Sequence, residues 1–214
     1  MNVIIFGPPG AGKGTQAQNI AKKFNLYQIS TGDILRSEIK KKTDIGKKIE
    51  SIISEGEFAT DDIVNKLLDK IIKDPAYKNR IILDGYPRNI DQAENLETIL
   101  KKDNQTISAV LFLKISRDIV EKRIIGRITC DKCNKTLNEF FSSKEEIASH
   151  SCGKDHFKKR EDDNLNTIAN RYDAYMYKTK PVLDFYSTRS YFHEIDGSQK
   201  IEEIASKIEQ ILNL

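Results

Sequence analysis

A glycine-rich segment near the start of the chain has the composition of a phosphate-binding loop. Residues 7–15 read GPPGAGKGT and directly follow the apolar run 3–6. The general pattern is G-x-x-x-x-G-K-[ST] between a strand and a helix, and Gly7, Gly12 and Lys13 match it. Glycines let backbone N–H groups turn inward, and the following helix adds its positive end. Lys13 would add a full charge for bound phosphates. The order of strand, loop and helix favours this interpretation over a simple glycine turn.

The loop departs from the general pattern at Gly14, which has no hydroxyl group to bind Mg²⁺, although Thr15 follows directly. Another residue must therefore contribute to the metal site. The segment RIILDGYPR, residues 80–88, is an apolar strand followed by Asp84. A carboxylate at the carboxyl edge of a parallel sheet can hold Mg²⁺ directly or through water. The alternative is that Asp84 caps the next turn.

The elements that must position these residues alternate along the chain. Apolar segments typical of strands lie at 3–6, 80–83, 109–113 and 191–195. Between them the apolar residues follow a helical period, as in the stripe Ala17, Ile20, Ala21 and Phe24 and in the pairs 63/64, 67/68 and 71/72 after a capping Thr60. This alternation predicts an α/β fold with a parallel sheet and helices on both faces.

Two segments interrupt this alternation. Residues 30–59 are helical in pattern and rich in lysine, with no strand for the sheet, and residues 129–159 lose clear periodicity and contain every cysteine. We interpret both as insertions into one core, because 214 residues are enough for a single substantial core with small added units.

Composition excludes several classes of protein. A formal net charge of +3 is too near balance for a non-specific nucleic-acid or membrane binder, so attraction to anions must be local. We find no apolar run of the roughly 20 residues that cross a bilayer, and no secretory leader. We therefore expect a cytoplasmic protein whose three cysteines stay reduced.

The cysteines have the spacing of a zinc knuckle. Cys130 and Cys133 form CDKC, and the later CGKD repeats that spacing with Cys152 and Asp155. A Cys₃Asp set is suitable for tetrahedral Zn²⁺, and four protein ligands leave no open position, which indicates a structural site. The alternative is three unrelated thiols.

Two histidines compete with Asp155 for the fourth position, namely His150 and His156. We favour Asp155 because it alone repeats the spacing of the first knuckle. Such a site would stiffen an insertion that is too small to have its own core.

Five motifs together resemble one enzyme family. GPPGAGKGTQA, ISTGDILR, LDGYPRNIDQAE, RIIGR and REDDNLNTIANR occur in the order and at the spacing of adenylate kinases, over essentially all 214 residues. The GKGT variant is usual in nucleoside monophosphate kinases. The resemblance implies a P-loop three-layer fold with a five-stranded parallel sheet, divided into a core (1–29, 60–126 and 160–214), a helical AMP-binding insertion (30–59) and a lid with the zinc knuckle (127–159).

The resemblance also implies the reaction and its residues. ATP and AMP would be converted reversibly into two ADP, with Mg²⁺ on ATP, under a closing lid. The implied ATP contacts are Gly10, Ala11, Gly12, Lys13, Gly14, Thr15, Arg123, Arg127, Thr136, Leu137 and Gln199. The implied AMP contacts are Thr31, Arg36, Glu57, Phe58, Ala59, Gly85, Tyr86, Pro87, Arg88, Gln92, Arg160 and Arg171. The implied catalytic residues are Lys13, Asp84, Arg88, Arg123, Arg160 and Arg171.

The many arginines suit this reaction. Phosphoryl transfer between two polyanions depends on alignment and on fixed positive charge, and arginine offers a planar fork that keeps its charge. Arg160 and Arg171 are eleven positions apart, about three helical turns, so we expect Arg160 at a helix entrance with Arg171 on the same side.

The acceptor base is predicted from Gln92, whose amide offers an acceptor and a donor side by side for adenine. Two positions depart from the family pattern: Ala59 replaces the usual valine, and Leu137 stands where the lid usually has an aromatic residue. A pyrimidine nucleoside monophosphate kinase is the second hypothesis, disfavoured by Gln92 and the long lid. A zinc-knuckle nucleic-acid-binding protein is the third, disfavoured because a basic, aromatic-rich surface is missing. We therefore expect ATP, AMP and ADP as partners, no nucleic acid or membrane, and a monomer.

Overall fold

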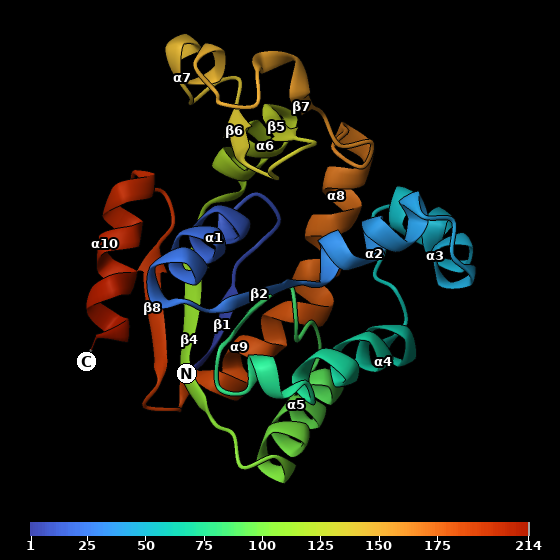
Figure 1. Ribbon diagram of the computed structural model, residues 1–214, viewed down its shortest axis with the longest axis vertical. Coiled ribbons are helices and arrows are strands. Elements are labelled where there is room, and N and C mark those ends of the chain that lie inside the picture. Colours follow the sequence, from blue (N-terminus) through green and yellow to red (C-terminus); the bar gives the residue numbers. More distant parts are fainter. Residues whose placement is uncertain (214) are drawn as a thin grey trace.

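The computed structural model describes residues 1–213 and has helices on both faces of a five-stranded sheet (Figure 1). The strands are β1 (Asn2–Phe6), β2 (Tyr27–Ser30), β3 (Ile81–Asp84), β4 (Ile107–Lys114) and β8 (Phe192–Asp196). Their order is β2-β3-β1-β4-β8, and every neighbouring pair is parallel. The predicted α/β fold class is thus confirmed. Leu214, the last residue of the predicted core, lies outside the described residues.

The burial of the central strands explains why their sequences are continuously apolar and do not alternate between apolar and polar residues. All five residues of β1 are buried, as are all four of β3, because helices cover both faces of the sheet. The edge strand β2, with the sequence YQIS, was not predicted. Only one of its residues is buried, and its short mixed pattern resembles that of a loop.

Two helices cover one face of the sheet. These are α1 (Lys13–Phe24) and α10 (Ile201–Leu212). The predicted stripe of α1 packs there, with Ala17 and Ile20 in one buried cluster with Val3 and Ile5 of β1. Successive side chains of a strand point to opposite faces of the sheet, so Ile4 and Phe6 of β1 lie on the face opposite to Val3 and Ile5.

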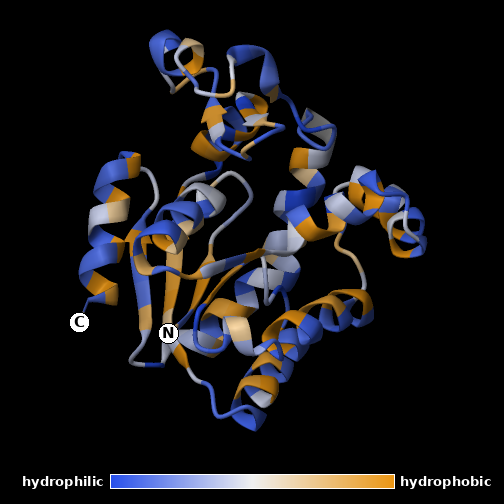
Figure 2. Ribbon diagram, viewed as in Figure 1, coloured by the Kyte–Doolittle hydropathy of each residue, from blue (hydrophilic) through white to orange (hydrophobic). Residues whose placement is uncertain are grey.

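The opposite face is covered by α5 (Ile90–Lys102) and α9 (Lys180–Ser187), and α4 (Asp61–Ile72) packs against α5. Their core includes Ile4, Leu96 and Tyr186. A third, smaller cluster joins α6 (Arg117–Ile125) to α8 (Leu165–Ala174). In Figure 2 apolar residues run along the central strand β4 of the main sheet, whereas the edge strand β8 and the surrounding helices mix polar and apolar residues.

The two interrupting segments protrude from this core (Figure 1). Residues 30–59 form α2 (Thr31–Lys40) and α3 (Asp44–Ser54), which pack on each other. The later segment forms β5 (Arg127–Cys130), β6 (Thr136–Asn138), α7 (Lys144–Ala148) and β7 (Phe157–Lys158), with β5 paired antiparallel to both other strands. Strands of two to four residues are too short to give a recognisable pattern, so this second sheet was not predicted.

Shorter turns complete the chain. Three-residue 3₁₀ turns lie at Pro75–Tyr77 and Lys154–His156, and a π-helical segment, Tyr175–Thr179, joins α8 to α9. Within residues 1–213 we find no helix with both the length and the apolar character that crossing a membrane requires.

Candidate nucleotide-binding site

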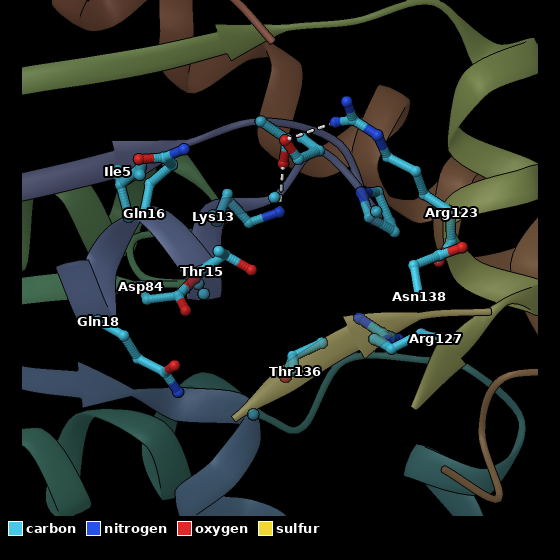
Figure 3. A pocket seen from close by; sticks show the side chains of 18 of the residues that line it. Ile5, Lys13, Thr15, Gln16, Gln18, Asp84, Arg123, Arg127, Thr136 and Asn138 are labelled. Atoms are coloured by element: carbon cyan, nitrogen blue, oxygen red, sulfur yellow. Dashed lines mark hydrogen bonds between the residues drawn. The ribbon is translucent and has the colours of Figure 1, made fainter. Parts of the chain in front are cut away.

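A cavity of about 870 Å³ opens beside the carboxyl ends of β1 and β3. Its walls come from the phosphate loop, from α2, from the turn after β3 and from the small second sheet. Figure 3 shows Lys13, Thr15 and Asp84 on one side and Arg123, Arg127 and Asn138 on the other. The carboxyl edge of a parallel sheet is the usual ligand position in α/β folds.

The predicted phosphate loop has the backbone that its glycines imply. Gly10 and Gly12 have φ angles of 79° and 94°, a region that residues with a Cβ atom rarely adopt. The loop leads into α1 at Lys13. Lys13 Nζ donates hydrogen bonds to the carbonyls of Gly7 (2.7 Å) and Pro8 (2.8 Å), so its charge lies over the loop.

Lys13 and Asp84 form the charged floor of the cavity. Desolvation lowers the pKa of Lys13 to about 8, with Asp84 acting in the opposite direction. Desolvation likewise raises the pKa of Asp84, although Lys13 opposes the shift. A Cβ atom on Gly14 would lie 3.5 Å from Asp84 Oδ2. The absence of a side chain at Gly14 therefore leaves room beside a carboxylate of the kind that Mg²⁺ prefers.

Arg88 is held from two sides. Its Nε donates to the carbonyl of Gly85 (2.7 Å), and its guanidinium lies over the ring of Phe58, 4.3 Å from the centroid. Desolvation, followed by the charge of Arg171, lowers the pKa of Arg88 to about 10. The site therefore concentrates positive charge that an anion would relieve.

Three acidic residues that the sequence analysis did not single out pair with the cavity arginines. Arg127 makes a two-pronged contact with Asp163, through Nε (2.7 Å) and through Nη2. Arg171 Nη1 contacts Asp162 Oδ2 at 3.0 Å and Asp163 Oδ1 at 3.3 Å. Desolvation alone would lower the pKa of Arg127, but its hydrogen bond with Asp163 raises it.

The third acid, Asp33, connects α2 to the later segment. Arg36 Nη2 donates to Asp33 Oδ1 at 2.5 Å, and Arg160 Nη2 lies 3.7 Å from the same oxygen. Arg36 also approaches Asp162 at 3.8 Å. The available signal was the position of these acids inside the arginine motifs STGDILR and REDD.

The predicted relation of Arg160 to a helix needs correction. Helix α8 begins at Leu165, where the side chain of Asn164 accepts from the Thr167 backbone N–H at 3.1 Å. Arg160 therefore lies in a turn before the helix, because this cap ends the irregular segment later than we expected. Arg160 and Arg171 nevertheless line the same cavity.

The predicted ATP contacts all line the cavity. They are Gly10, Ala11, Gly12, Lys13, Gly14, Thr15, Arg123, Arg127, Thr136, Leu137 and Gln199. Arg123 Nη1 donates to the carbonyls of Ala11 (3.3 Å) and Gly197 (2.9 Å). These contacts join α6 to the phosphate loop and to the loop that follows β8. Gln18 on α1 donates to the carbonyl of Asn134 at 3.1 Å, so the cysteine-rich segment touches the core directly.

The predicted AMP contacts divide into two groups. Arg36, Phe58, Gly85, Pro87, Arg88, Arg160 and Arg171 line the cavity. Among the described residues, the lining excludes Thr31, Glu57, Ala59, Tyr86 and Gln92. Of these, Thr31 donates to the carbonyl of Gly85 at 2.7 Å and Gln92 accepts from the Arg88 backbone N–H at 2.7 Å, so both lie directly behind the wall.

The cysteines form a cluster with a histidine. One ligand atom from each of Cys130, Cys133, His150 and Cys152 lies within 4.8 Å of the others. Cys133 Sγ is 3.4 Å from His150 Nε2. Desolvation would raise the pKa of Cys130, but hydrogen bonds led by the Cys133 backbone N–H lower it to about 6. This donor set has the number and type of ligands of a closed zinc site.

The cluster differs from the predicted ligand set in one member, because His150 rather than Asp155 lies with the three cysteines. After Cys152 the chain turns at Gly153, which has a φ angle of 90°, and Asp155 is exposed in the 3₁₀ turn that follows. The other candidate, His156, pairs with Asp131 at 2.7 Å. The second CxxC-like spacing therefore does not repeat the geometry of the first.

Comparison with known proteins points to one family. The family model described as adenylate kinase matches residues 5–191. An adenylate kinase of Pelagibacter ubique is 58% identical over 214 residues, covering 100% of both chains. An adenylate kinase of Rickettsia africae is 38% identical over 215 residues with 100% of both chains covered, and one of Listeria innocua is 37% identical over 212 residues with 99% of each covered.

Proposed function

Because the chain belongs to the adenylate kinase family, we propose a role for each group of cavity residues in the family reaction. The chain is a nucleoside monophosphate kinase that transfers a phosphoryl group between ATP and AMP and gives two ADP. The observation that most supports the proposed roles is the gathering of one lysine and several arginines around one cavity at the carboxyl edge of the sheet.

The donor nucleotide is proposed to bind at the phosphate loop. The backbone N–H groups of residues 10–15 and the start of α1 would surround the phosphates, and Lys13 would move from its carbonyl partners to phosphate oxygens. The buried carboxylate of Asp84 fits a Mg²⁺ ion carried by ATP, which would supply charge neutralisation on the phosphates.

The acceptor nucleotide is proposed to bind between α2 and the turn after β3. Arg36 and Arg88 would grip the phosphate of AMP, and Gln92 would contact its base. The backbone of residues 57–59 would complete the base pocket. Binding here requires the wall beside Gln92 to open, since its side chain is buried in the structure described.

The transferred group is proposed to pass between Lys13, Arg123, Arg160 and Arg171. These groups stabilise the charge that spreads over the phosphoryl group in a loose transition state. Asp162 and Asp163 hold Arg127 and Arg171 in the cavity before substrate binds. Phosphate oxygens would then bind the same arginines, either beside these carboxylates or in their place. The arginine side chains would therefore need little reorganisation.

We further propose that residues 127–159 act as the lid, residues 30–59 as the AMP-binding unit and the rest as the core. Adenylate kinases are themselves standard examples of lid closure, which keeps water from competing with the acceptor. The contact between Gln18 and Asn134 supports this role, because it joins the lid to α1 beside the phosphate loop.

The cysteine cluster is proposed to hold a structural Zn²⁺ through Cys130, Cys133, His150 and Cys152. Four protein ligands fill a tetrahedral zinc, so the ion would stabilise the short strands of the lid and take no part in chemistry. Thiols must stay reduced to bind zinc, so we also propose a cytoplasmic location, and we propose that the enzyme works as a monomer on ATP, AMP and ADP alone.

An acceptor panel tests this proposal. Initial rates with ATP and Mg²⁺ would be measured for AMP, CMP, UMP and GMP, with and without prior chelation of zinc. We expect AMP to be the best acceptor by a wide margin and its rate to need Mg²⁺. Equal or better rates with CMP or UMP would contradict the proposed base pocket.

A further inference from the structure

A polar network surrounds the Gln92 side chain behind the cavity wall. Gln92 Oε1 accepts from the Arg88 backbone N–H at 2.7 Å, and Gln92 Nε2 donates to Asp61 Oδ1 at 2.6 Å. Gln92 is 3% exposed, so water has little access to its amide, and each of the two contacts is partly buried. The partners differ in kind: a backbone N–H can only donate, and an ionised carboxylate can only accept.

These partners fix which way the amide faces. If the amide were rotated by half a turn, its NH₂ group would meet the Arg88 N–H and its oxygen would meet Asp61. Two hydrogen bonds would then be replaced by a donor–donor and an acceptor–acceptor contact in a buried place, which is strongly unfavourable.

Asp61 is itself held in place. Its two carboxylate oxygens accept from Asn89 Nδ2 at 3.0 and 2.9 Å, while Asn89 Oδ1 accepts from the Gln92 backbone N–H at 2.8 Å. Asp61 is also the first residue of α4, where the positive end of a helix favours a negative charge. The network therefore connects the start of α4, the start of α5 and the turn that contains Arg88.

We propose that Asp61 is a positioning residue that fixes the Gln92 amide in one orientation and thereby makes the acceptor site select 6-aminopurine over 6-oxopurine nucleoside monophosphates. The two contacts use one lone pair and one N–H of the amide, and leave one of each. In this orientation the oxygen suits a 6-amino group and the NH₂ suits an unprotonated N1, as in adenine. A 6-oxopurine presents an acceptor and an N1–H donor, the reverse pattern. This inference rests on the proposed base contact of Gln92.

The test compares AMP with IMP, which differs at the 6-position and N1 and has no 2-amino group. Asp61→Asn replaces a group that can only accept by an amide that can donate or accept, so the Arg88 backbone N–H alone still favours this orientation of the Gln92 amide. Asp62→Asn is the matched control, because Asp62 also lies in the first turn of α4 and is exposed. For each protein, kcat and KM are measured for both acceptors at saturating MgATP, after thermal unfolding has established that the variant is folded.

We expect the AMP to IMP ratio of kcat/KM to fall at least about tenfold in Asp61→Asn, mainly through KM, and to stay within about twofold in Asp62→Asn. A merely structural role would weaken both acceptors together and leave the ratio unchanged. A folded Asp61→Asn protein that keeps the wild-type ratio would overturn the inference. Asp61→Ser, which also removes the one-way acceptor, decides the question by the same criterion if Asp61→Asn does not fold.

Failure of the inference and failure of the proposed function give different results. If the wild type does not phosphorylate AMP, the proposed function fails. If the wild type prefers AMP and Gln92→Ala keeps that preference, Gln92 does not contact the base, and the inference fails with that contact. If Gln92→Ala loses the preference and Asp61→Asn keeps it, only the role of Asp61 is overturned.

Discussion

The guanidinium of Arg88 lies over the ring of Phe58, with 4.3 Å between the guanidinium carbon and the ring centroid. Lys178 approaches the same ring, its Nζ 5.8 Å from the centroid. A cation over an aromatic face is stabilised by the ring's electron distribution, most strongly when water is excluded. Phe58 thus supports, on its flat face, the arginine proposed to grip the acceptor phosphate.

The first prediction concerns this support. Phe58→Leu should lower kcat/KM for AMP by about three- to tenfold, since a partly desolvated cation–π contact contributes roughly 1 kcal/mol. Phe58→Tyr is the matched control, because it keeps an aromatic face, and it should stay near the wild type. Steady-state rates at varied AMP give both values. Equal kcat/KM in the leucine and wild-type proteins would show that the contact has no functional effect.

The second prediction concerns protons. In the free enzyme the pKa of Lys13 is about 8, so its amine is charged below that pH and mostly neutral above it. Bound phosphates should raise the pKa of Lys13 back toward its ordinary value of 10.5, because their negative charge favours the protonated amine. MgATP binding at pH 8.5 should therefore take up more than about half a proton, and at pH 7 almost none. Calorimetry in buffers with different ionisation enthalpies measures this uptake.

The control for that experiment is Lys13→Met, which should remove most of the uptake at pH 8.5. Wild-type protein that takes up no proton at pH 8.5 would contradict the shifted pKa of Lys13.

The third prediction concerns stability. The side chain of Asp163 is 1% exposed and contacts both Arg127 and Arg171. Asp163→Asn should lower the free energy of unfolding by about 3 kcal/mol, because it leaves two largely buried guanidinium groups short of a counter-charge. Asp173→Asn, which changes an exposed acid on α8, should have almost no effect. Urea unfolding monitored by circular dichroism compares the two, and similar midpoints would refute the prediction.

The fourth prediction separates the candidate zinc ligands. His150→Ala should reduce bound zinc well below one equivalent and lower the melting temperature, whereas Asp155→Ala should keep the metal, because only His150 lies in the cluster. Metal analysis of protein purified without chelator measures both. Zinc loss on changing Asp155, with retention on changing His150, would contradict the ligand set proposed from the structure.

Much of the core could be predicted because its physical signals are local. The run at β1 is fully buried, and the stripe of α1 packs where its helical period implies. The edge strand β2 gave no such signal, since only one of its four residues is buried. The second sheet was missed for a similar reason, because its strands are held by few ladder bonds and have little core of their own.

The sequence analysis predicted the positively charged residues of the site but not the acidic residues that pair with them. Arginines and the phosphate loop have recognisable spacing, whereas the pairing of Asp163 with Arg127 depends on contacts across 36 positions of the chain. Asp155 was expected beside the three cysteines, but His150 lies there instead, because spacing alone does not specify backbone direction. The turn at Gly153 takes Asp155 away from the cluster, while His150, before Cys152, enters it.

The central claim is that one folded chain seats two nucleotides so that cationic side chains stabilise the phosphoryl group between them. Phosphorus NMR of ADP mixed with the purified protein and Mg²⁺ tests it most directly. We predict that ATP and AMP appear in equal amounts, and that folded Arg88→Ala slows this conversion by at least about a hundredfold. ADP that remains unchanged with folded wild-type protein, or a folded Arg88→Ala variant that is as fast as the wild type, would contradict the account.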